Sequence, residues 1–120
     1  MVSNPKNKLV TLNLKDNEEK AILKAAKLLK DDFPVEKVIL FGSKARGDDE
    51  EGSDIDLMLL TSRPIHWKER ERIISALFDI EIEFDVVISI LGTTVSEWNE
   101  GRFSSFPIRD HIYREGIMAS

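Results

Sequence analysis

The chain of 120 residues contains no cysteine, which excludes disulfide frameworks and thiolate metal sites. It also has no apolar run near the roughly 20 residues that a membrane-spanning helix needs. Residues 1–8 are polar and lack the apolar core of a signal peptide. We therefore expect a cytoplasmic protein without a membrane contact.

An excess of positive charge is also lacking, because 22 Asp and Glu outweigh 17 Lys and Arg and leave a net charge of −5. Nucleic-acid-binding domains usually carry a basic surface, so direct nucleic-acid binding is not expected. The length indicates a single domain over residues 1–120, and no repeat or linker interrupts it. Hydrophobic residues make up 42% and charged residues 32%, which is typical of a globular domain.

The hydrophobic pattern predicts a succession of helices and strands. The expected helices cover residues 17–31, 66–79 and 107–116, with a short one near Trp98 that begins at Thr94 or Ser96. The expected strands cover residues 38–41, 54–60 and 83–90, and residues 10–14 form a short strand or an extended arm. These elements predict an α+β fold, in which a small mixed β-sheet carries helices packed on one face.

Local signals add detail to three of these elements. Asp16 and Glu19 have the spacing of a capping box for the first helix. The second helix is predicted to bury Trp67, Ile74, Leu77 and Phe78. The segment 98–106 is the preferred candidate for a partner-binding or mobile stretch. His66 and His111 lack metal-ligand spacing and are expected at the surface or at a helix cap.

Two carboxylates, Asp54 and Asp56, open the second predicted strand. Side chains alternate across a strand, so residues at i and i+2 share a face. Two like charges this close repel each other unless a cation lies between them or one carboxylate is protonated. Hard oxygen ligands suit Mg²⁺ together with substrate phosphates. The alternative is a solvated strand entrance in which Asp54 caps a turn.

A third carboxylate, Asp85, interrupts the apolar run of the third predicted strand. Burial of its charge without a partner would be costly. If this strand neighbours the strand of Asp54 and Asp56, three carboxylates converge and can hold one or two metal ions. The alternative is a surface-facing Asp on a half-exposed edge strand.

A turn at Gly42 and Ser43 follows the first predicted strand. Gly42 permits unusual dihedral angles, and Ser43 adds a hydroxyl and a backbone N–H at a helix start, where phosphates bind. Lys44 and Arg46 add positive charge. The pattern is common on its own, and Arg46 can instead pair with Asp48 or Asp49.

Taken together, residues 40–47 (LFGSKARG), 53–57 (SDIDL) and 84–87 (FDVV) resemble the DNA polymerase β-like nucleotidyltransferase superfamily. The chain is most similar to the minimal nucleotidyltransferases (MNT), which are often paired with HEPN proteins. The resemblance covers residues 20–116, and residues 112–117 (IYREGI) also look like the C-terminus of that family.

The resemblance implies a role for each matching residue. Gly42 and Ser43 would bind the triphosphate, and Arg46 would contact phosphate or support the loop. Asp54 and Asp56 would coordinate Mg²⁺, and Asp85 would complete the metal site and help to deprotonate the acceptor hydroxyl.

The function that the resemblance implies is transfer of a nucleoside monophosphate, AMP from ATP, to an acceptor hydroxyl. Only about 30 residues follow the third predicted strand, so nothing obvious holds the acceptor. In characterised MNT–HEPN pairs the MNT member is the antitoxin, and some members modify a tyrosine of the HEPN partner. We therefore expect a hetero-oligomer with a HEPN-type toxin. The alternatives are a catalytically silent antitoxin that neutralises its partner by binding, and a small α/β domain with an incidental cation site.

Overall fold

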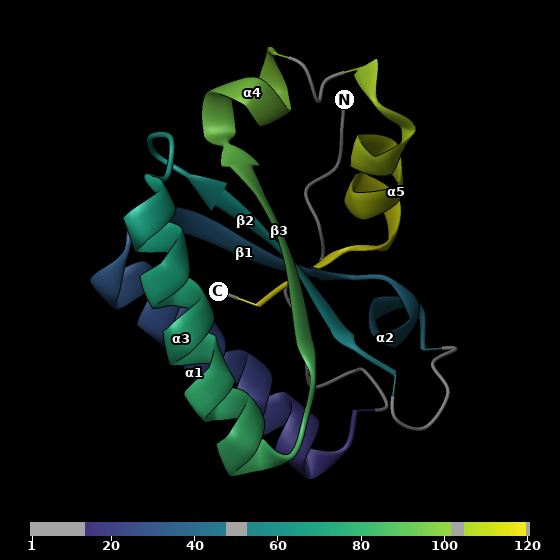
Figure 1. Ribbon diagram of the computed structural model, residues 1–120. Helices are drawn as coiled ribbons and strands as arrows, with labels where there is room; N and C mark the ends of the chain where they lie inside the picture. Colours follow the sequence, from purple (N-terminus) through teal and green to yellow (C-terminus); the bar gives the residue numbers. More distant parts are fainter. Residues whose placement is uncertain (1–13, 48–52, 102–104, 120) are drawn as a thin grey trace.

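The computed structural model describes residues 14–47, 53–101 and 105–119. Figure 1 shows its helices and strands. In chain order these are α1 (Asp16–Asp32), β1 (Val35–Phe41), α2 (Ser43–Arg46), β2 (Ile55–Thr61), α3 (Trp67–Phe84), β3 (Ile88–Thr94), α4 (Val95–Asn99), α5 (Pro107–Glu115) and β4 (Ile117–Met118). The predicted strand or arm at 10–14, apart from Leu14, lies outside the described residues, as do residues 48–52 and 102–104.

The strands of the described residues form one mixed sheet in the order β3-β2-β1-β4. β1 pairs with β2 and β4 in antiparallel fashion, and β2 pairs with β3 in parallel. The parallel pair needs a long crossover, which α3 supplies. The predicted α+β fold with a small mixed sheet is confirmed, and β4, which the pattern did not predict, completes it.

Two hydrophobic clusters lie on opposite faces of this sheet. α1 and α3 lie side by side on one face, where the larger cluster includes Ile22, Leu29, Leu57 and Leu77. The predicted helix layer on one face is present, but the prediction of helices on one face alone was wrong, because α4 and α5 cover the other face. On the other face, α4 and α5 cover a smaller cluster around Trp98, which is 1% exposed. This second face carries the side chains of Asp54 and Asp56, because side chains alternate along β2.

The N-terminus of α1 lies close to its predicted position, but its capping differs. The helix begins at Asp16, and Glu18 rather than Glu19 accepts the backbone N–H of Lys15, at 2.9 Å. The other carboxylate oxygen of Glu18 forms an ion pair with the buried Lys44 of α2. This long-range ion pair holds the side chain of Glu18 in place. The local sequence pattern around Asp16 and Glu19 does not indicate the pair.

Helix α3 continues to Phe84, five residues beyond its predicted end, and it turns a different face inward. Ile73, Leu77 and Ile80 are buried, whereas Trp67 and Phe78 are 60% and 57% exposed. The helix carries apolar residues on two stripes, so its periodicity could not decide which stripe packs on the sheet. The predicted inward face was therefore wrong, apart from Leu77.

The third strand begins at Ile88, so the prediction of a strand over 83–90 was wrong. Phe84 packs against the larger cluster as the last residue of α3, and Asp85 ends the helix in the left-handed conformation at φ 55°. Asp tolerates this conformation better than most residues do. The carboxylate of Glu81 then accepts the backbone N–H of Ile88 at 3.0 Å, which orients the chain into β3.

Three further local predictions, for the starts of α3, α4 and α5, are confirmed. Thr94 caps α4 by accepting the backbone N–H of Glu97 at 3.1 Å. His66 lies at the N-cap of α3, and α5 begins at Pro107 as predicted. In the described part of the chain, every helix is too short or too polar to cross a membrane.

Candidate functional site

The turn between β1 and α2 brings Gly42 against Asp56. Gly42 has a φ of 76°, which L side chains rarely adopt. Asp56 pairs with Phe41 across the antiparallel strands. A Cβ placed on Gly42 would overlap the Oδ2 atom of Asp56. The glycine is therefore required both for the backbone turn and for the close approach of the carboxylate.

Asp54 and Asp56 lie at the start of β2, as the sequence predicts, with Asp54 exposed and Asp56 half-buried. Ser89 of β3 pairs with Asp56 in the parallel register, and its hydroxyl donates a hydrogen bond to Oδ2 of Asp54 at 2.9 Å. Strand β3 therefore supplies a hydroxyl to this site, and no sequence motif had indicated it.

The electrostatic environment of Asp56 favours its neutral form in the metal-free protein. Burial raises the pKa of Asp56 above its ordinary value, and the charge of Asp54 raises it further. The positive charges of Arg46 and Lys44 lower this pKa, but by less. A cation bound between the two carboxylates would relieve both the burial cost and the repulsion.

Lys44 anchors α2 to α1 through its buried ion pair with Glu18. Lys44 is 2% exposed and Glu18 is 8% exposed. Removal of one partner from a buried ion pair leaves an uncompensated charge. The sequence analysis took Lys44 only as a positive charge near the turn and missed this structural role, because Glu18 lies 26 positions away in the chain.

Arg46 lies at the exposed end of α2 and contacts α5. Its Nη1 atom lies 3.4 Å from Oε2 of Glu115. The predicted alternative partners, Asp48 and Asp49, lie outside the described residues. Arg46 thus contacts α5, a segment that no sequence motif connected to it.

A cavity of about 410 Å³ lies beside the glycine turn. Its walls come from the end of β1, the turn, α2 and one side of α5, and they comprise Phe41, Gly42, Arg46, Ile108, His111, Ile112 and Glu115. The α5 residues were missed as site residues, although residues 112–117 carried a weak family signal. Ligand cavities commonly have volumes of 300–1,000 Å³, so this one is large enough for part of a nucleotide.

A second cavity, of about 420 Å³, lies at the other end of β2 and includes Leu59, Thr61, Arg70 and Gly92 in its wall. Neither cavity includes Asp54 or Asp56 in its wall. The first one includes Gly42, which lies directly against Asp56, whereas the second lies at the opposite end of β2. The cavity beside Gly42 is therefore the better candidate for a ligand of the carboxylate site.

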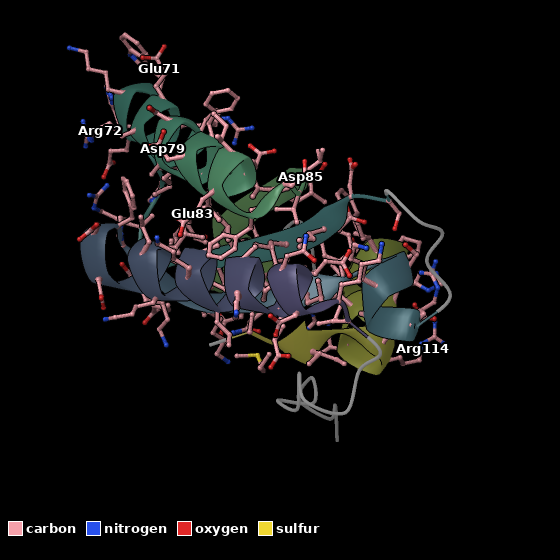
Figure 2. All side chains as sticks on the ribbon, turned by 90° about the horizontal axis from the view of Figure 1, so that it is seen from below. Glu71, Arg72, Asp79, Glu83, Asp85 and Arg114 are labelled. Atoms are coloured by element: carbon pink, nitrogen blue, oxygen red, sulfur yellow. The ribbon has the colours of Figure 1, made fainter. Side chains whose placement is uncertain are left out.

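Asp85 is not brought to the carboxylate pair in the way that the sequence predicted. It is an exposed residue at the C-cap of α3 rather than part of a strand, and Figure 2 shows it at the end of that helix. Among the residues that the structure describes, no group of three or more His, Asp or Glu side chains could hold a metal ion. The predicted convergence of three carboxylates required Asp85 on β3, and that placement is wrong.

The remaining donor set fits a hard divalent cation that is shared with substrate phosphates. Asp54 and Asp56 offer carboxylate oxygens, which Mg²⁺ prefers. The hydroxyl oxygen of Ser53 is buried and makes no hydrogen bond within the described part of the chain. Gly42 also lines the adjacent cavity, from which a ligand can approach the backbone of the turn. Two carboxylates suffice when the nucleotide supplies further oxygens.

Known proteins match a large part of this chain. The family model for polymerase beta nucleotidyltransferases matches residues 23–97, more than half of the chain. The chain is 40% identical over 62 residues to the putative protein adenylyltransferase MJ0141 of Methanocaldococcus jannaschii, covering 52% of this chain and 61% of that protein. A second such protein of the same organism, MJ0604, is 50% identical over 46 residues, covering 37% of this chain and 46% of that protein. The matched segments thus span less than two thirds of the length of these curated relatives.

Solved structures share the fold at low sequence identity. A toxin–antitoxin crystal structure with AMP-PNP has a TM-score of 0.58 at 18% identity, covering 85% of this chain and 72% of that chain. A putative minimal nucleotidyltransferase has a TM-score of 0.54 at 24% identity, covering 88% of this chain and 97% of that chain. The match of the family model, together with the glycine turn beside the carboxylate pair, shows that the chain belongs to the polymerase β nucleotidyltransferase family.

Proposed function

We propose that this protein transfers a nucleoside monophosphate, AMP from ATP, to a hydroxyl of a partner protein and releases pyrophosphate. The observation that carries the proposal is the close approach of Gly42 to Asp56, with Asp54 beside it on the same strand. Membership of the nucleotidyltransferase family supports the reaction class. The relatives named as protein adenylyltransferases support AMP as the transferred group.

Asp54 and Asp56 are the residues that we propose as Mg²⁺ ligands. When it is bound, Mg²⁺ neutralises charge on the phosphates and on the carboxylates. Gly42 and Ser43 contribute the turn against which the triphosphate lies, and the cavity beside them holds the nucleoside. Arg46 lines this cavity together with Gly42, so we propose that it contacts phosphate. Asp85 remains a prediction from the resemblance, and its exposed position gives it no support.

In the proposed reaction, the acceptor oxygen forms a bond to the α-phosphorus while the bond from that phosphorus to the pyrophosphate oxygen breaks. The hydroxyl proton passes to a carboxylate of the site or to water. Catalysis of this type depends mainly on positioning and charge stabilisation. The chain contributes the fixed turn, the paired carboxylates and the wall formed by α5.

The acceptor is proposed to come from another chain, a HEPN-type toxin, for which this protein is the antitoxin in a cytoplasmic hetero-oligomer. The support is twofold. Relatives are named protein adenylyltransferases, and structures of toxin–antitoxin proteins share the fold. Within the described residues, α4 and α5 are the only helices after β3, and both pack on the sheet.

A second candidate function is neutralisation by binding alone, with a catalytically silent nucleotide site. The exposed apolar stripe on α3, which includes Ile74, Phe78 and Ile82, is the observation that favours a binding role. The two functions differ in their dependence on Asp56. If Asp56→Asn still neutralises the toxin fully, occlusion is favoured. If it binds the toxin without neutralising it, chemistry is favoured.

Transfer itself is tested with ATP labelled on the α- or the γ-phosphate, incubated with Mg²⁺, this protein and a HEPN-type protein as the candidate acceptor. We expect label on the partner only from the α-phosphate, and none with Asp56→Asn. Label from the γ-phosphate would indicate a kinase instead. Undiminished α-label with Asp56→Asn would contradict the proposed site.

A further inference from the structure

The face of the sheet that carries the carboxylate pair has different side chains on its two neighbouring strands, β2 and β3. Asp54, directly before β2, and Asp56 of β2 face the site. Ser89 and Leu91 of β3 share this face, because residues alternate and Ser89 pairs with Asp56, and Val87, directly before β3, follows the same alternation. The segment 87–91 therefore presents a hydroxyl between two exposed apolar side chains on this face, and no carboxylate.

The Ser89 hydroxyl has a specific partner. It donates to Oδ2 of Asp54 at 2.9 Å across the parallel pair. Within the described residues the other oxygen, Oδ1, makes no hydrogen bond. The backbone holds this geometry, because the N–H of Ile55 donates to the carbonyl of Val87 at 2.8 Å and fixes the start of β2 against β3.

We propose that Ser89 is a positioning residue for the nucleotidyltransferase site, where it holds one oxygen of Asp54 and leaves the other for a divalent cation. The inference rests on the proposed function, because Asp54 is a metal ligand only there. Hydrogen bonds to a ligating carboxylate orient it, and their loss typically weakens metal binding by about 10- to 100-fold. Ser89 is exposed, where water competes, so the lower end of this range applies.

The hydroxyl also distinguishes this site from one with three carboxylates. A third carboxylate at position 89 would add negative charge beside Asp54, whereas Ser89 stabilises the charge of Asp54 without adding its own. Cation binding at this site therefore depends on the orientation of two carboxylates. Loss of the hydrogen bond from Ser89 to Asp54 is expected to weaken cation binding.

The test compares Ser89→Ala, Ser89→Thr and the control Ser62→Ala in the full chain. Ser62 lies beyond the other end of β2, and its hydroxyl is 3.5 Å from the carbonyl of Pro34. Binding of Mn²⁺ in the presence of ATP is followed by the loss of the free Mn²⁺ signal in electron paramagnetic resonance, with Mn²⁺ and ATP alone as the blank. Thermal unfolding without metal shows whether each variant is folded.

We expect Ser89→Ala to bind Mn²⁺ about tenfold more weakly than wild type, at an unchanged melting temperature. Ser89→Thr, which keeps the hydroxyl, is expected to stay within about threefold, and Ser62→Ala is expected to match wild type. Equal Mn²⁺ affinity of wild type and Ser89→Ala would overturn the role of Ser89 and leave the proposed function standing. Failure of wild type and Ser62→Ala to bind Mn²⁺ with ATP would overturn the proposed function, and this inference with it.

Discussion

The carboxylate of Asp56 fills the space in which a side chain at position 42 would lie. Any Cβ there would overlap Oδ2 of Asp56, and the φ of 76° is one that other residues rarely adopt. The turn at Gly42 and the strand that carries Asp56 are therefore in direct contact. A change on the turn displaces a carboxylate of the site.

Substitution of this glycine should thus weaken ligand binding without abolishing the fold. Gly42→Ala is expected to weaken Mg²⁺-dependent ATP binding by more than about tenfold, because the backbone strain of about 1–3 kcal/mol comes with a displaced Asp56. Gly47→Ala is the matched control. Gly47 also has a positive φ, 81°, but a Cβ there meets nothing within 4 Å. Calorimetric titration of both variants measures the difference, and equal losses would contradict a specific role of Gly42.

The buried ion pair between Lys44 and Glu18 should dominate the stability of the α1–α2 contact. Lys44→Met leaves the buried Glu18 without its partner and is expected to lower the free energy of unfolding by about 3 kcal/mol. Lys44→Met with Glu18→Gln removes both charges and keeps an acceptor for the N–H of Lys15, so it should recover most of this loss.

Urea-induced unfolding of these variants checks the prediction. Lys20→Met is the control, because its ion pair with Asp16 has side chains that are 62% and 82% exposed, and exposed pairs contribute less than about 1 kcal/mol. If Lys44→Met and Lys20→Met lowered stability equally, the buried pair would not anchor α2.

Prediction from sequence succeeded where the signal was local, and it failed where distant packing decided. Gly42 and the alternation of Asp54 and Asp56 are local features, and the structure has them as expected. The end of α3 was missed because Phe84 is held in a core formed with α1. The pairing of Lys44 with Glu18 and the approach of α5 to Arg46 depend on tertiary contacts that no short motif encodes.

Asp56 should make the stability of the metal-free protein depend on pH. Its folded-state pKa is raised by burial and by Asp54, so the group penalises folding once it is ionised. Below its ordinary pKa of about 4, both the folded and the unfolded states are protonated and the penalty is absent. As the pH rises through the folded-state pKa, the penalty develops fully.

Asp56→Asn should therefore raise the melting temperature of the metal-free protein at pH 7–8, and the gain should disappear as the pH falls toward about 4. Added Mg²⁺ should stabilise the wild type and not the variant. Asp79→Asn, on the exposed side of α3, is the control and should show neither effect. Thermal unfolding across this pH range makes the measurement, and a lower melting temperature of Asp56→Asn at pH 7–8 would be the contrary result.

Asp85 provides a direct comparison between the family resemblance and the geometry. Asn also tolerates the left-handed backbone at this C-cap, so Asp85→Asn should fold normally. Because Asp85 is exposed and lies outside β3, we expect the Mg²⁺-dependent ATP affinity of the Asp85→Asn protein to stay within about threefold of wild type. A loss as large as that of Asp56→Asn would show that Asp85 is a third ligand and that two carboxylates do not suffice.

The measurement that tests the central claim most directly is calorimetric titration of ATP with Mg²⁺ onto the wild-type protein and onto Asp54→Asn/Asp56→Asn. The claim is that these two carboxylates, set against the turn at Gly42, form a metal–nucleotide site. We predict saturable, Mg²⁺-dependent binding by the wild type and no detectable binding by the double variant at an unchanged fold. Equal binding by the two proteins, or none by the wild type, would contradict the account.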